Sequence, residues 1–205
     1  LSRVVVAIDP PATASVETAE AGIIAVGRAA DGMAYVLADA SIHGTPDDWG
    51  RAAIRLYDEF KADQIVGEVN NGGDMVGFTV RECAKALCRE GERKSSVVPY
   101  VPVRASRGKL TRAEPIAALY SQGRVRHCGM FTDLEDQMTS WVPGEKSPDR
   151  LDAMVWAMTS LVIYGSDDIE VWGGEGNERP SRYVERVATS QGTWFPPSGG
   201  TRLWG

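Results

Sequence analysis

The sequence predicts a mixed α/β fold in which a five-stranded sheet carries helices on both faces. The first three strand-like runs follow one another closely, and a turn at Asp31-Gly32 joins the second to the third, as in an antiparallel meander. The remaining two runs are separated by segments with helical spacing, which favours helix-linked strands and hence a mixed sheet. The five expected strands are residues 3–9, 21–28, 33–40, 64–69 and 97–103.

Helix signals separate and follow these strands. Thr45 is a typical N-cap, Pro46 suits the first helical position, and two acids follow in the first turn. Apolar residues then recur at helical spacing up to Phe60. Further helices are expected at residues 75–89, 109–121, 131–141 and 148–164.

Length and composition predict one folded domain. The chain has 205 residues, of which 43% are hydrophobic, enough for a single sizeable core over residues 1–165. Residues 166–205 are rich in Gly, Pro, Ser and charge and are expected to form a loosely ordered tail. No apolar run reaches about 18 residues, so no membrane partner is expected. The start, Leu1-Ser2-Arg3, lacks both signal-peptide features and an initiator Met, which favours a fragment of a longer protein.

The cysteine pattern favours a reducing cytoplasm. Cys83, Cys88 and Cys128 are odd in number and show no CxxC spacing, so neither a disulfide framework nor a structural zinc site is expected. His43 and His127 lie far apart, which gives no support to a histidine-built zinc site.

Charge is unevenly distributed along the chain. The net charge is −6, but residues 81–126 hold eleven Lys/Arg and only four Asp/Glu. The rest of the chain holds eleven Lys/Arg and twenty-four Asp/Glu. A basic segment of this kind can follow a phosphate backbone. It can equally be a solvated face, and the charge pattern alone leaves both interpretations open.

Four carboxylates stand at the ends of expected elements. Asp9 ends the first strand, Glu68 lies near the end of the fourth, and Asp149 and Asp152 lie three residues apart at the start of the last helix. That spacing places the last two on one helix face. If strands one and four are neighbours, all four acids can reach one sheet edge.

Clustered carboxylates repel each other unless a cation compensates them. Mg²⁺ and Mn²⁺ prefer carboxylate and water ligands, and two such ions about 4 Å apart can hydrolyse a phosphodiester. Three of the four acids also have a structural interpretation. Asp9 can end a strand, and Asp149 can be an acid of the first helical turn that the helix dipole stabilises. Asp152 can form an ion pair with Arg150 or Arg112. Glu68 is the hardest to explain structurally, because Glu is unusual in an apolar strand.

Five stretches resemble the nuclease domain of phage and gene-transfer-agent large terminase subunits. They occur in the same order over about residues 3–163. The stretches are Ala7-Ile8-Asp9-Pro10, Gly67-Glu68-Val69-Asn70-Asn71-Gly72-Gly73-Asp74, Gly108-Lys109-Leu110-Thr111-Arg112-Ala113-Glu114-Pro115, Leu134-Glu135-Asp136-Gln137-Met138 and Ser147-Pro148-Asp149-Arg150-Leu151-Asp152-Ala153.

The resemblance implies a ribonuclease H-like fold and a two-metal endonuclease that cuts concatemeric double-stranded DNA during genome packaging in the bacterial host's cytoplasm. Asp9, Glu68 and Asp149 would be catalytic acids that bind Mg²⁺ or Mn²⁺, and Asp152 an auxiliary acid or further ligand. Many relatives have His-Asp-Asp where this chain has Ser147-Pro148-Asp149, which leaves open which acid of the last helix contacts metal.

The resemblance also gives the basic segment a role. We expect four of its residues to hold DNA phosphates beside the acids, with a solvated loop as the alternative. These residues are Arg104, Arg107, Lys109 and Arg112. The implied partners are DNA, an upstream packaging ATPase domain, the portal and the small terminase subunit. The chain itself has no GxxxxGK[ST] phosphate loop.

Two other functions remain open at this point. Another ribonuclease H-like nuclease, such as a junction resolvase or transposase, shares the acidic site and differs in preferring branched DNA. A DNA- or portal-binding module without catalysis is the non-enzymatic alternative.

Overall fold

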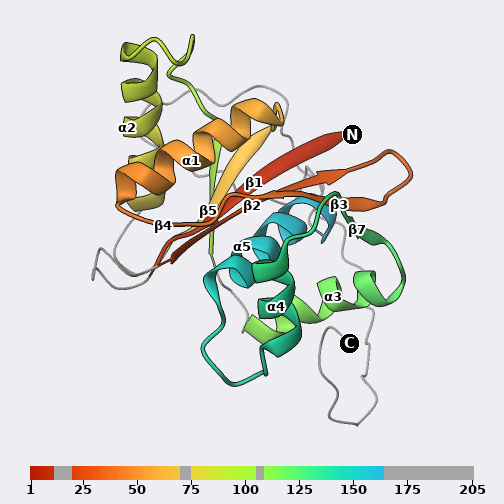
Figure 1. Ribbon diagram of the computed structural model, residues 1–205. Coiled ribbons are helices and arrows are strands. Elements are labelled where there is room, and N and C mark those ends of the chain that lie inside the picture. Colours follow the sequence, from red (N-terminus) through yellow and green to blue (C-terminus); the bar gives the residue numbers. More distant parts are fainter. Residues whose placement is uncertain (12–19, 70–74, 105–108, 164–205) are drawn as a thin grey trace.

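A twisted mixed sheet forms the centre of the computed structural model, which describes residues 1–11, 20–69, 75–104 and 109–163 (Figure 1). The sheet has seven strands in the order β6-β5-β1-β2-β3-β7, and β4 pairs with β2. β1 pairs antiparallel with β2 and parallel with β5, and β5 pairs parallel with β6. The strands are β1 (Arg3–Asp9), β2 (Glu20–Arg28), β3 (Ala34–Asp39), β4 (Ile42–His43), β5 (Gln64–Glu68), β6 (Tyr100–Val103) and β7 (Val125–His127).

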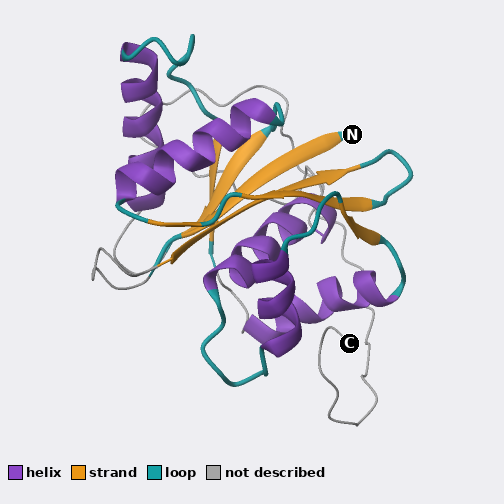
Figure 2. Ribbon diagram, viewed as in Figure 1, coloured by secondary structure: helices purple, strands orange, loops and turns teal. Residues whose placement is uncertain are grey.

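Helices cover both faces of the sheet, as the sequence predicted (Figure 2). Alternate residues of β1 explain the two layers: Val4 and Val6 pack with α1 and α2, whereas Val5 and Ala7 pack with α3, α4 and α5. A strand that is buried on both faces is continuously apolar, and the sequence of β1 from Val4 to Ile8 shows this pattern. The helices are α1 (Pro46–Glu59), α2 (Met75–Arg89), α3 (Lys109–Ser121), α4 (Thr132–Ser140) and α5 (Asp149–Met158).

The predicted start of α1 at Thr45 is confirmed by local geometry. The side chain of Thr45 accepts a hydrogen bond from the Asp48 backbone N–H, and the Asp48 carboxylate accepts one from the Thr45 N–H. This reciprocal pair satisfies two backbone donors that the first helical turn leaves open. Pro46 follows in the first turn, as expected.

The expected fold class is confirmed, but the strand count of five was too low. The two strands that were missed, β4 and β7, have two and three residues, so they carry almost no periodic signal. The fifth strand begins at Tyr100 rather than at residue 97. The last helix ends its α-helical part at Met158 and continues as a π-helix, Thr159–Ile163.

The expected tail at 166–205 lies outside the described residues. Among the described helices, none combines the length and the apolar character that a membrane span requires.

Candidate active site

Two of the predicted acids end neighbouring parallel strands. β1 and β5 run side by side, and their last registered pair is Ile8 with Gly67. Asp9 and Glu68 are the next residues on each strand, so both carboxylates stand at the same edge of the sheet. Asp9 is 8% exposed and Glu68 is half-buried. The sequence-based condition that these two strands be neighbours is therefore met.

The start of α5 lies directly on this edge. Gly22 of β2 is paired with Asp9 across the antiparallel ladder. A Cβ atom built on Gly22 would lie 2.0 Å from the backbone oxygen of Asp149 and 2.9 Å from the Arg150 nitrogen. Only a residue without a side chain permits this approach. The backbone of Asp149 is thus held beside the strand that neighbours Asp9.

Asp152 is turned toward the start of its own helix. It is 6% exposed, and its Oδ2 accepts a 2.5 Å hydrogen bond from the Ser147 hydroxyl. Its backbone N–H donates to the Pro148 carbonyl oxygen. Asp149 is half-buried in the same turn. The two acids share the first turn of α5 but differ in exposure.

Arg150 anchors that turn to the sheet. Its guanidinium donates to Asp39 of β3 at 2.7 Å and to Glu20 of β2 at 2.6 Å, and it lies 3.3 Å from Asp133 of α4. Burial lowers the pKa of Arg150, but the hydrogen bonds to Glu20 and Asp39 outweigh burial, so the net pKa is raised. Arg150 is therefore a fixed cation that pairs with Glu20, Asp39 and Asp133.

Glu68 is held by a side chain two turns beyond the start of α5. The indole Nε1 of Trp156 donates to Glu68 Oε2 at 3.1 Å. The guanidinium of Arg112, from α3, lies over the Trp156 ring at 4.1 Å from its centre. Arg112 is 8% exposed, although the sequence placed it among the residues expected to contact phosphate.

The other expected DNA contacts are placed only in part. Arg104 is exposed and directly follows Val103, the residue of β6 that pairs with Glu68. It therefore stands at the same sheet edge as the acids. Arg107 lies outside the described residues, and for Lys109 the description covers only the backbone, which begins α3.

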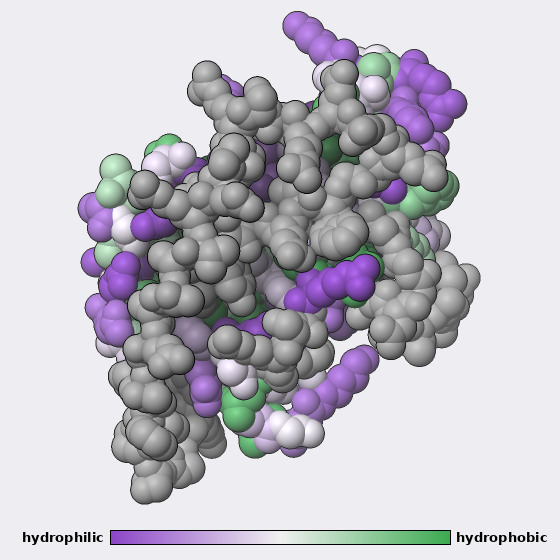
Figure 3. Space-filling model, turned by 180° about the vertical axis from the view of Figure 1, so that it is seen from behind, coloured by the Kyte–Doolittle hydropathy of each residue, from purple (hydrophilic) through white to green (hydrophobic). Residues whose placement is uncertain are grey.

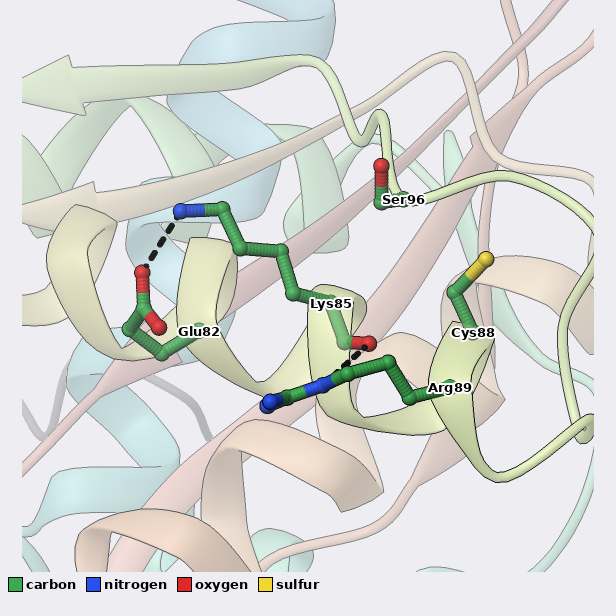
Figure 4. A pocket seen from close by; sticks show the side chains of 5 residues that line it. All are labelled: Glu82, Lys85, Cys88, Arg89 and Ser96. Carbon is green, nitrogen blue, oxygen red and sulfur yellow. Dashed lines mark hydrogen bonds and ion pairs between the residues drawn. The ribbon is translucent and has the colours of Figure 1, made fainter.

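Much of the basic segment lies elsewhere. α2 packs on the face opposite α5, and hydrophilic residues gather at its far end, at the upper right of Figure 3. Figure 4 shows the pocket there, in which Lys85 pairs with Glu82 at 2.8 Å and Arg89 donates to the Lys85 carbonyl. This pocket contains none of the predicted acids, so the solvated-face interpretation suits this half of the segment.

The donor set at the sheet edge suits a hard divalent cation. Asp9 and Glu68 are adjacent carboxylates, and Asp149 begins the helix that crosses over them. Within the described parts of the chain, no three His, Cys, Asp or Glu side chains are gathered as a metal-binding group. Three elements therefore bring residues of the right chemical type to one edge, but in the described residues their side chains do not converge on a single ion position.

Sequence reasoning missed three contributors to this edge. Gly22 gave no local signal, because close approach of a distant helix leaves no pattern in a strand. Arg150 was considered only as a partner of Asp152. Trp156 lies seven residues after Asp149, which places both on one face of α5, so helical spacing could have identified it.

The meander, the helix-linked parallel strands and the acids at the edge define a ribonuclease H-like fold. The chain belongs to the terminase RNase H-like domain family, whose model matches residues 6–161. No curated protein shows significant sequence similarity to the chain.

Similar solved structures are Holliday junction resolvases. The yeast mitochondrial Holliday junction resolvase Ydc2 is 11% identical, with a TM-score of 0.47, over 75% of this chain and 76% of that one. Thermus thermophilus RuvC in complex with a Holliday junction substrate is 14% identical, with a TM-score of 0.41, over 76% of this chain and 91% of RuvC.

Proposed function

We propose that this chain is a two-metal-ion endonuclease that cuts concatemeric double-stranded DNA during viral or gene-transfer-agent genome packaging. One observation carries the proposal: the ends of β1 and β5 and the first turn of α5 meet at a single sheet edge. Membership of the terminase RNase H-like family supports the nuclease class. DNA, an upstream ATPase domain, the portal and the small terminase subunit are the partners that this function requires.

Asp9, Glu68 and Asp149 would hold the metal, with Asp152 supporting the first turn of α5 through Ser147. Bound Mg²⁺ or Mn²⁺ would activate a water molecule and stabilise the leaving oxygen of the phosphodiester. The acids themselves repel DNA, so a cation must bring the backbone to the edge. Arg104 is exposed beside Glu68 and is positioned to contact a phosphate.

The test is cleavage of plasmid DNA by the purified chain with Mn²⁺ or Mg²⁺. We expect nicking or linearisation with little sequence preference, no activity in EDTA, and no preference for a four-way junction over linear duplex. Asp9→Ala, Glu68→Ala and Asp149→Ala should each abolish cleavage and leave DNA binding largely intact, whereas Asp152→Ala should be milder. Glu59→Ala, which changes an exposed acid of α1, is the matched control.

Two results would overturn this function. Cleavage that persists in EDTA would exclude the metal mechanism, and a wild-type rate for Glu68→Ala would remove β5 from the site. A strong preference for four-way junctions would instead favour a resolvase.

DNA binding is tested separately. Arg104→Ala should weaken binding to all sequences and reduce the slope of log affinity against log salt by about one. The reason is that each phosphate contact releases about one counterion from the DNA, and the variant has one contact fewer. Lys94→Ala, which changes an exposed lysine in the loop after α2, is the control and should leave the slope unchanged. The same loss of slope is predicted for Arg107→Ala and Lys109→Ala.

A further inference from the structure

We infer that Trp156 is a positioning residue for the Glu68 carboxylate, and that Arg112 acts through Trp156 and not through a DNA phosphate. The inference rests on the proposed function and goes beyond it by assigning two residues that do not touch the metal. It is carried by a chain of contacts that runs from α3 through α5 to β5.

The first link is the hydrogen bond between the Trp156 indole and Glu68. An indole N–H can only donate, so the bond commits Oε2 of Glu68 to one direction. A glutamate has three rotatable side-chain bonds, and fixing one oxygen also restricts where the other one points. Hydrogen bonds of this kind orient carboxylate ligands of metal ions, and losing one typically weakens metal affinity by about 10–100-fold.

The second link is the charge of Arg112 on the face of the indole. The guanidinium carbon lies 4.1 Å from the ring centre, within the range of a cation–π contact. A positive charge on the ring face fixes the plane of the indole and draws electron density from it, which strengthens its N–H as a donor. Arg112 therefore supports the bond to Glu68 without touching the carboxylate.

The burial of Arg112 favours this role over a phosphate contact. The side chain is 8% exposed, and its Nε is buried without a hydrogen-bond partner among the residues that the structure describes. A buried guanidinium nitrogen without a hydrogen-bond partner costs stability, so packing alone does not explain an arginine at this position.

Placement of Trp156 on α5 joins the two ends of the site. Trp156 follows Asp149 by seven residues and so lies on the same helix face, two turns further on. The first turn of α5 lies against Gly22 of β2, whereas Trp156 reaches Glu68 on β5. One helix thus sets the positions of two of the proposed metal-binding acids.

The experiment compares Trp156→Phe with Trp141→Phe in the full 205-residue chain. Both variants lose an indole N–H bond from a buried Trp, but Trp141 donates to the backbone oxygen of Glu145, away from the acids. Mn²⁺ binding is measured by calorimetry without DNA, and steady-state cleavage is measured in parallel. We expect Trp156→Phe to bind Mn²⁺ about 10-fold more weakly and to lower kcat with little change in KM.

Equal Mn²⁺ affinity and kcat in the two variants would overturn the role of Trp156. That outcome is distinct from failure of the proposed function, which would appear as absence of Mn²⁺ binding and cleavage in the wild type. Thermal melts of both variants separate a positioning effect from loss of folding.

Arg112→Met provides an independent test, because it keeps the bulk of the side chain and removes the charge. DNA binding is measured in EDTA over a range of salt concentrations. We expect the salt slope to match the wild type while Mn²⁺ affinity falls several-fold. A slope reduced by about one, as expected for Arg104→Ala, would show a phosphate contact and overturn the role of Arg112.

Discussion

Gly22→Ala probes the close approach between β2 and the first turn of α5. The new Cβ would lie 2.0 Å from the Asp149 backbone oxygen, more than 1 Å closer than carbon and oxygen atoms pack. The helix must therefore move by about an ångström. Overpacking of this size costs about 1–3 kcal/mol, which lowers the Tm of a chain this long by about 2–12 °C. A 1 Å misplacement of Asp149 would also slow cleavage by about 100-fold.

Gly27→Ala on the same strand is the control. Its Cβ would lie 2.6 Å from the Leu1 side-chain tip, which is 66% exposed and free to rotate away. Both variants restrict the unfolded chain equally, so their difference isolates the contact with α5. Thermal melts and plasmid cleavage are measured on both. Equal Tm and equal cleavage rates for the two variants would refute the placement of α5 over Gly22.

Three further predictions concern charge. Without metal, Asp9→Asn should be at least as stable as the wild type, with a gain in unfolding free energy of up to about 1 kcal/mol. With Mn²⁺ it should be less stable than the wild type, because it has lost a ligand. A metal-free variant that melts below the wild type would contradict a shared acidic edge. Arg150→Met should lower the free energy of unfolding, measured with urea, by about 3 kcal/mol, because the variant leaves buried carboxylates without their cation. A decrease of less than about 1 kcal/mol would count against the role of Arg150 as an anchor. A hydrogen bond from His127 lowers the pKa of Glu135 below the usual range of a glutamate. The native state therefore has the full stabilisation above that usual range and loses it as the pH falls through the lowered pKa. Glu135→Gln should flatten the acid limb of a plot of unfolding free energy against pH, and parallel curves for the variant and the wild type would refute the assignment.

Much of the sheet could be predicted because its central strands are continuous apolar runs. β1 and β2 are buried on both faces, so each strand can be recognised from its own run of apolar residues. β7 could not be predicted, since a three-residue strand exists only through its parallel pairing with β3. Its stability comes from tertiary contacts and leaves no local pattern.

The position of a candidate residue was predictable where it follows from the residue's place at the end of an element, and the proposed roles are a separate matter for experiment. Asp9 and Glu68 meet because β1 and β5 are parallel neighbours, a topology that helix-linked strands favour. Arg112 shows where such reasoning ends. Its charge suggested a phosphate contact, but Ala113 and Ile116 turn α3 inward and bury the guanidinium against Trp156. Charge can be counted from sequence, whereas exposure depends on packing.

The most direct test of the central claim is a crystal structure of the chain soaked in Mn²⁺. We expect anomalous density for one or two ions at the sheet edge, bound by carboxylate oxygens of Asp9, Glu68 and Asp149. A soaked crystal of Asp9→Asn should lose at least one of these ions. Active crystals that hold no Mn²⁺ at this edge, or that hold it away from all three acids, would contradict the account.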